Sequence, residues 1–296
     1  MLGAKPFDVV TFLLAISLGA GWQLTYGPYV ADYSRYLPAD TPTARSFRST
    51  FLGSVLGSQL SMTVGALIAA VPAGADKSKG FLANQVGFIG DLAGGGGIAL
   101  LIYVVIVTGK LTVNCLNAYG GSMTLLTTTS AFRRDARVTT AARTAYIVGF
   151  LVVSVLLALL ASADFLSNFK NFVLVLLMVF TPWSAVNLVD YYLISREKVD
   201  IPALYDPDGR YGRWNAPALT AYVVAIVAQV PFLAQSLYTG PVTGWLGGAD
   251  ISWIVGLVVA GAVYYPWARR TSRAPDAMVY PAGSGLGDEA SAEVSR

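Results

Sequence analysis

The sequence predicts an all-α protein that crosses a membrane several times, and three observations carry this prediction. Of the 296 residues, 55% are hydrophobic and only 12% are charged, and the mean hydropathy is +0.58, which is outside the range of ordinary soluble domains. Apolar runs of about 20 residues, the length that crosses a bilayer, recur along the chain. Basic residues gather in every second segment between these runs.

Seven candidate spans follow one another, and little sequence is left for a soluble domain. They lie at about 8–31, 50–73, 97–126, 144–162, 165–195, 216–238 and 246–267. We expect one transmembrane domain over residues 1–270. Residues 271–296 are rich in Ala, Gly, Ser and Pro and are expected to form a disordered cytoplasmic tail.

The distribution of basic residues predicts the orientation of the chain in the membrane. One set of alternate segments (35–48, 133–143, 196–213 and 269–273) carries fourteen Lys and Arg residues, and the other set carries two, Lys77 and Lys79. By the positive-inside rule the first set is cytoplasmic, together with the C-terminus. Seven spans then place the N-terminus outside, although residues 1–7 contain no signal peptide. We therefore expect an odd number of upstream spans to be missing; the alternative is a natural seven-span protein with an exported N-terminus.

The composition argues against enzyme chemistry. The chain has no histidine, and its single cysteine, Cys115, lies inside a span, so neither a disulfide nor a metal-site pattern is present. The spans also lack clustered carboxylates. We expect no cofactor and no nucleic-acid partner; the expected surroundings are the lipid bilayer of the cell membrane.

The end of the first span, GAGWQLTYGPYVADYSRYLP (19–38), combines glycine and proline at membrane depth. Gly27 and Pro28 predict a helix break, which the hydrocarbon region tolerates only where protein or a polar cavity satisfies the freed backbone groups. Secondary transporters commonly build their substrate sites at such breaks. The first span therefore indicates transport.

The third span carries a polar stripe. Lys110, Asn114, Asn117 and Gly121 are spaced to share one helix face. A lysine near the middle of a span costs at least ~2.5 kcal/mol on insertion scales, so it should face a cavity or a partner. One interpretation gives the stripe a substrate or coupling role; the other is that the two asparagines only join helices through hydrogen bonds.

The fifth span contains Pro182, which predicts a kink, and Asp190 near its inner end. We expect Asp190 to be an interfacial charge that balances Arg196 or its neighbours.

Three motifs, GPYVADYSRYLP (27–38), TVNCLNAYGGSM (112–123) and PWSAVNLVDYYLISR (182–196), the last followed by DGRYGRWN (208–215), resemble the purine–cytosine permease family, also called the nucleobase–cation symporter family. The resemblance covers residues 6–270. It implies a twelve-span protein whose core is a five-plus-five inverted repeat of the leucine-transporter type. This chain resembles spans six to twelve, that is, the second inverted repeat plus two extra helices.

The resemblance also implies site residues. Family members stack the substrate between aromatic side chains of the third and sixth spans, and an asparagine of the eighth span hydrogen-bonds it. Here the sixth-span aromatic resembles Trp22, with Gln23 and Tyr26 as neighbouring candidates, and the third-span partner is absent. The eighth-span residue is Asn114 or Asn117, with Asn114 preferred.

Sodium-coupled members place hydroxyl residues of the eighth span at their cation site, and Thr108 fits that position here. Lys110 does not fit a sodium site, and its ammonium group in place of the ion suggests proton coupling. The expected function is import of a nucleobase or a related heterocycle (cytosine, a purine, uracil, allantoin or hydantoin), coupled to H+ in preference to Na+. The alternatives are an inactive fragment, and a channel or other membrane-embedded protein of a different class.

Overall fold

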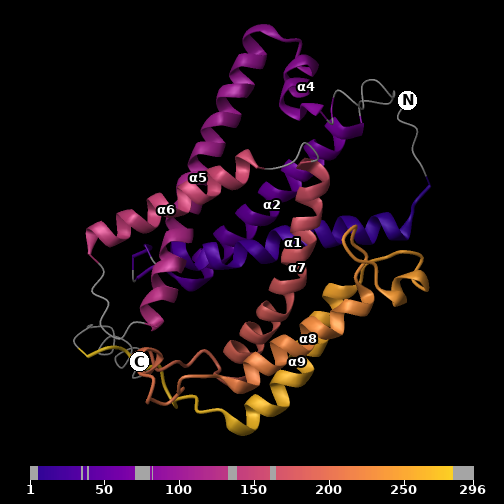
Figure 1. Cartoon of the computed structure of the whole chain (residues 1–296). Helices are drawn as coiled ribbons and strands as arrows, with labels where there is room; N and C mark the ends of the chain where they lie inside the picture. Colours follow the sequence, from indigo (N-terminus) through magenta and orange to yellow (C-terminus); the bar gives the residue numbers. More distant parts are fainter. Residues whose placement is uncertain are drawn as a thin grey trace. The chain divides into compact units, whose positions relative to one another are not determined.

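The protein is built from helices, which Figure 1 colours in chain order. The structure, a computed structural model, describes residues 6–34, 36–38, 40–70, 81, 83–132, 139–160 and 165–282. Its α-helices are α1 (Val9–Ser34), α2 (Thr43–Ala70), α4 (Gln85–Leu92), α5 (Gly96–Phe132), α6 (Thr140–Leu159), α7 (Phe165–Leu188), α8 (Ala216–Gln229) and α9 (Ser252–Thr271). Shorter helices are the π-helix η1 (Val189–Ile194) and the 3-10 turns η2 (Pro202–Tyr205), η3 (Val230–Phe232) and η4 (Pro241–Gly244). Pairing of the β type in the described residues consists of two isolated bridges, so the all-α prediction is confirmed.

Five helices are long and apolar enough to cross a membrane. They cover Val9–Val30, Thr43–Ala70, Gly96–Thr129, Thr140–Leu159 and Asn168–Ile194, in the order of the first five predicted spans. The sixth predicted span, 216–238, is shorter than expected, because the apolar helix ends at Phe232. Pro231 lies in its closing 3-10 turn, where the missing N–H stops the helical ladder. The seventh, α9, has 20 residues and carries Arg269 and Arg270 in its last turn, and it is not among these five helices.

The expected helix break at Gly27 and Pro28 is not observed. Helix α1 continues from Val9 to Ser34 with Pro28 inside it. A proline removes one hydrogen-bond donor, so only the carbonyl of Leu24 loses its helical partner while the rest of the ladder is kept. The sequence-based prediction of an unwound segment is therefore wrong for this structure.

The chain divides into two compact units, and the division falls inside α1. The described part of the first unit begins at Gly27 and ends at Ser167, and that of the second comprises Pro6–Tyr26 and the chain from Asn168 onward. In the first unit, α5 packs closely on α6. A Cβ atom on Gly121 would overlap the ring of Phe150, so the bare glycine permits this approach.

The second unit has its core between α7, α8 and α9. Small residues let these helices approach: Ala185, Ala225 and Ala260 form one buried cluster, and Ala221, Tyr264 and Ala268 form another. The first half of α1 also belongs here. A Cβ atom on Gly21 would lie 2.9 Å from Cγ1 of Val173 on α7, so this glycine too marks a close contact.

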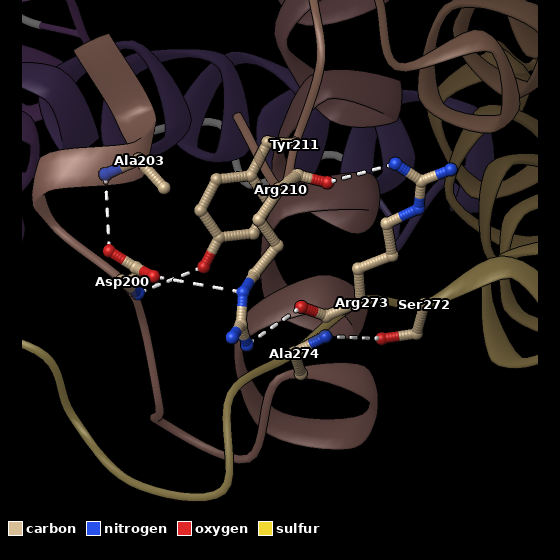
Figure 2. Close-up of polar contacts among 7 residues, drawn as sticks. All are labelled: Asp200, Ala203, Arg210, Tyr211, Ser272, Arg273 and Ala274. Carbon is tan, nitrogen blue, oxygen red and sulfur yellow. Dashed lines mark hydrogen bonds and ion pairs between the residues drawn. The ribbon is translucent and has the colours of Figure 1, made fainter. Parts of the chain in front are cut away.

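A loop of the second unit is fastened to the segment after α9, as Figure 2 shows. Arg210 lies 3.7 Å from the carboxylate of Asp200 through Nε and donates from Nη1 to the carbonyl oxygen of Arg273 at 3.2 Å. Arg273 donates in turn to the carbonyl oxygen of Arg210 at 3.4 Å. Further along, the N–H of Val279 donates to Val199, and its carbonyl accepts from Ile201. We call residues 199–211 and 272–280, with these contacts, the loop–tail clasp.

The clasp includes part of the segment expected to be a disordered tail. Residues 272–282 are described and hydrogen-bonded as above, whereas residues 283–296 lie outside the described residues. The assignment of residues 283–296 to a disordered cytoplasmic tail stays a prediction.

Candidate functional site

The first two family-like motifs meet in a polar contact between α1 and α5. The hydroxyl of Tyr29, on the second half of α1, donates to Oδ1 of Asn117 on α5 at 3.0 Å. Beyond the end of α1, the hydroxyl groups of Tyr36 and Tyr119 are 2.7 Å apart and share a hydrogen bond. We call these four residues the tyrosine–asparagine contact; it joins segments that are about 80 to 90 residues apart in the chain.

Two side chains of α1 lie against α5 at Gly120, next to this contact. A Cβ atom on Gly120 would lie 3.8 Å from Cε1 of Tyr29 and 3.9 Å from Oδ2 of Asp32. These are ordinary contact distances, so both side chains of α1 lie against the α5 surface at this point. From α6, the guanidinium carbon of Arg143 lies 5.9 Å from the ring centroid of Tyr119, within the range of a cation–π interaction. The contact therefore draws on three helices of the first unit.

The members of the predicted α5 stripe differ in exposure and in hydrogen bonding. Asn117 is half-buried and hydrogen-bonded to Tyr29, whereas Asn114 and Lys110 are exposed in the described chain. Thr108 is exposed as well, and its carbonyl accepts from the hydroxyl of Thr112 at 2.9 Å. Because α5 is one continuous helix, the spacing of the stripe along one side is kept.

The aromatic candidates lie on the first half of α1, in the second unit. Trp22 is 51% exposed. The hydroxyl of Thr25 donates within the helix to the carbonyls of Gly21 and Trp22. That Trp22, Gln23 and Tyr26 share one substrate site with an asparagine of α5 stays a prediction.

The sequence reasoning missed Tyr29, Tyr36 and Tyr119. All three belong to the quoted motifs, and Tyr29 directly follows the Gly27–Pro28 pair. Their place within the motifs was the signal that could have selected them.

The third motif carries a polar contact of its own, around Asp190. This residue lies in the π-helix Val189–Ile194, and its Oδ1 accepts a 2.5 Å hydrogen bond from the hydroxyl of Tyr264 on α9. Its Oδ2 accepts from the hydroxyl of Ser195 at 3.2 Å. In the part of the chain that the structure describes, the ion pairs are Arg210–Asp200 and Arg213–Asp208. The expected ion pair of Asp190 with Arg196 or its neighbours is therefore not observed; hydroxyl groups hold the carboxylate.

The described residues contain no cluster of three or more His, Cys, Asp or Glu side chains that could hold a metal ion. The polar groups that the structure brings together are amide, phenol, hydroxyl and single carboxylate groups. Such groups suit the recognition of a polar small molecule by hydrogen bonds.

Comparisons with known proteins bear on this arrangement. A family model described as a permease for cytosine/purines, uracil, thiamine and allantoin matches residues 2–256. A protein of Bacillus subtilis (strain 168), named as a purine-cytosine permease, YxlA, is 37% identical over 258 residues, which are 87% of this chain and 54% of that protein. The chain thus spans about half the length of this curated relative. No solved structure matches.

Proposed function

We propose a transport function from one premise: this chain belongs to the family of permeases for cytosine/purines, uracil, thiamine and allantoin. It is a multi-pass membrane protein of the nucleobase-permease kind, and its family points to a transporter rather than an enzyme. Our proposal is that it contributes to a secondary active importer of a nucleobase or related heterocycle. Candidate substrates are cytosine, a purine, uracil, allantoin and hydantoin, and the C-terminus is cytoplasmic.

The observation that carries the proposal is the hydrogen bond from Tyr29 to Asn117. It brings the first two motifs together and holds one asparagine amide in a defined orientation between two helices. An amide offers a donor and an acceptor side by side, which matches the edge of a nucleobase. The bond favours Asn117 over Asn114 as the residue that recognises the base, because Asn117 is half-buried and held by Tyr29, whereas Asn114 is exposed on α5.

Trp22 is the proposed stacking surface. A base stacked on an aromatic side chain gains about 1–3 kcal/mol, whichever base it is, so stacking supplies affinity while the amide supplies selectivity. Gln23 and Tyr26 lie within one turn of Trp22 and are the remaining candidates for contact with the substrate on this part of α1.

Coupling to protons is proposed in preference to sodium. Lys110 lies in the interior of α5, far from both helix ends, where its charge is costly unless a cavity or partner receives it. Thr108, two residues earlier, is the hydroxyl candidate for the same cation site. In the Lys110→Ala variant we expect accumulation to become independent of the proton gradient.

The test is uptake of the radiolabelled candidate substrates by cells that express the complete gene product and lack competing permeases. Asn117→Ala and Trp22→Ala should each raise the KM of the transported base by about 5- to 150-fold, the equivalent of about 1–3 kcal/mol. The matched control is Tyr205→Ala, which removes an aromatic side chain that is 85% exposed and should leave the KM unchanged. Absence of uptake for every candidate substrate would contradict the proposal.

A further inference from the structure

Asp190 is a carboxylate inside a membrane span, and the substrate recognition proposed above does not use it. The span covers Asn168–Ile194, so Asp190 lies four residues before its end. Its partner Tyr264 is 2% exposed and packs with Ala221 and Ala268 in the apolar core between the helices of the second unit. An ionisable side chain in such a place is costly and is usually retained for a function.

No ion pair includes this carboxylate in the described structure. The described ion pairs involve Asp200 and Asp208 and leave Asp190 out. Charged and titratable groups of the surrounding elements are Tyr191 and Tyr192 on the π-helix, Arg196, Glu197 and Lys198 in the turn after it, and Tyr264, Tyr265, Arg269 and Arg270 on α9. Of these, the group that contacts Asp190 is the neutral phenol of Tyr264, and α8 contributes the apolar Ala218 and Ala221 to the cluster around it. A structural ion pair is therefore not the reason for a carboxylate here.

The hydrogen-bond partners fit both protonation states of Asp190. When the carboxylate is ionised, Tyr264 donates to Oδ1 and Ser195 donates to Oδ2. When a proton is bound at Oδ2, the carboxyl group can donate it to the Ser195 oxygen, because a hydroxyl can turn from donor to acceptor by rotating its hydrogen. Tyr264 keeps its bond to Oδ1 in both states. The site can take up or release one proton without leaving a buried polar atom unpaired.

The backbone around Asp190 is also unusual. The residues from Val189 to Ile194 form a π-helix, and the N–H of Ser195 donates to the carbonyl of Asp190 at 2.7 Å, one residue beyond the α-helical spacing. π-helical turns are rare and occur frequently at functional sites. Here the extra residue in the turn brings the Ser195 hydroxyl back to the side chain of Asp190.

We propose that Asp190, held by Tyr264 and Ser195, is a proton-binding site of the transport cycle at the cytoplasmic end of the span Asn168–Ile194. The inference rests on the proposed transport function and adds a second titratable position to Lys110. One proton binds to the carboxylate in each transport cycle and is then released from it to the cytoplasm, and no other bond is made or broken. Charge removal at Asp190 therefore uncouples transport from the proton gradient while substrate exchange continues.

The test uses the complete protein in proteoliposomes and a base found to be transported. Two rates are measured: accumulation driven by a pH gradient, and exchange of external labelled base for internal unlabelled base without a gradient. With one proton per substrate, a gradient of one pH unit sustains about a tenfold accumulation in the wild type. Asp190→Asn keeps an oxygen for Tyr264 and an amide donor for Ser195, but it cannot cycle a proton. We expect its accumulation ratio to fall to about one, the value without coupling, with exchange still measurable.

A second variant and a control separate coupling from folding. Tyr264→Phe keeps the ring in its apolar site and removes one donor to the ionised carboxylate, so the pH dependence of uptake should shift to higher pH. Asp206→Asn removes a carboxylate from an exposed loop of the same unit and should change neither rate.

The outcomes distinguish the two proposals. Accumulation by Asp190→Asn equal to the wild type would overturn the proton site while the transport function stands, and so would a wild type driven by sodium instead of protons. If Asp190→Asn is not folded, an unchanged pH dependence in Tyr264→Phe overturns the site instead. A wild type that transports no candidate substrate would overturn the proposed function itself, and the proton site with it.

Discussion

The side-chain amide of Gln229 on α8 donates a 3.0 Å hydrogen bond to the main-chain carbonyl of Met178 on α7. In an unbroken α-helix this carbonyl would accept from the N–H of residue 182, but residue 182 is proline and has none. Gln229 is fully buried and donates a second, longer bond to the carbonyl of Ala225. A side chain of one helix thus replaces the backbone donor that its neighbour lacks.

Replacing Gln229 should destabilise the α7–α8–α9 core. In Gln229→Leu the carbonyl of Met178 is left buried without a donor, which costs about 1–3 kcal/mol. The check is the free energy of unfolding, or the thermal midpoint, of the purified protein in detergent. In a Pro182→Ala background the backbone N–H returns, and the same substitution should cost less; equal costs in both backgrounds would contradict the explanation.

Gly256 on α9 should tolerate no side chain, because Gln229 occupies the space. A Cβ atom there would lie 2.5 Å from Cδ of Gln229. We expect Gly256→Ala to destabilise the protein by about 1–3 kcal/mol through overpacking. Gly261→Ala is the control on the same helix, since its Cβ would meet Val189 at 3.9 Å, an ordinary contact. Equal stability of the two variants would count against the close packing described for α8 and α9.

The Tyr29 hydroxyl should matter for substrate affinity rather than for folding. Tyr29→Phe keeps the ring against Gly120 but removes the donor to Asn117, and a lost neutral hydrogen bond is worth about 0.5–1.5 kcal/mol. We therefore expect the KM of the transported base to rise about 2- to 12-fold with little change in expression. Tyr205→Phe, at an exposed tyrosine without this role, should behave like wild type. An unchanged KM for Tyr29→Phe would remove Tyr29 from the recognition contact.

The loop–tail clasp should depend on Arg210 more than on Arg213. Arg210 contacts both Asp200 and the carbonyl of Arg273, whereas Arg213 pairs with the exposed Asp208 within the same loop. Partly exposed ion pairs contribute little, so Arg210→Ala should cost below about 1 kcal/mol of global stability. It should nevertheless release residues 272–280, which limited proteolysis would detect as faster cleavage after α9. Cleavage at the same rate in both variants would show that Arg210 does not hold the segment.

Asp8 should make the stability of the start of α1 depend on pH. Its carboxylate accepts hydrogen bonds from the N–H and the hydroxyl of Thr11, and the side-chain bond, followed by the backbone bond, holds the pKa of Asp8 below its usual 3.8. The ionised cap stabilises the helix above pH 3.8, and this contribution is lost as the pH falls through the lower, folded-state pKa. Thr11→Ala should raise the pKa of Asp8, measurable by NMR titration of its labelled carboxyl carbon. A pKa that does not move would contradict the cap.

The long helices could be predicted from the sequence because length and apolarity alone decide whether a segment crosses a bilayer. The same rule overestimated the sixth span. Hydrophobic residues continue past Pro231, but the helix ends there, because proline lacks the N–H that would extend the hydrogen-bond ladder. A different rule, that glycine and proline break helices, led to the predicted break at Gly27 and Pro28; there the rest of the hydrogen-bond ladder outweighs the one bond that a proline removes.

Polar contacts were predictable only along one helix. The spacing of Lys110, Asn114 and Asn117 follows from periodicity, and α5 retains it. That Tyr29 meets Asn117, or Tyr264 meets Asp190, depends on helices far apart in the chain. Charge complementarity within the chain pointed to Arg196 for Asp190, yet a phenol and a hydroxyl satisfy this carboxylate instead.

The isolated β-bridge between Asp200 and Val279 has a consequence for biosynthesis. The loop after α7 emerges from the ribosome well before the residues that pair with it, since α8, α9 and the turn between them come first. Until Val279 is synthesised, the backbone groups of Val199 and Ile201 must be satisfied by water. A chain that stops at the end of α9 would contain all the described helices and still lack the partner that closes this loop, so the loop–tail clasp can form only after α9 is complete.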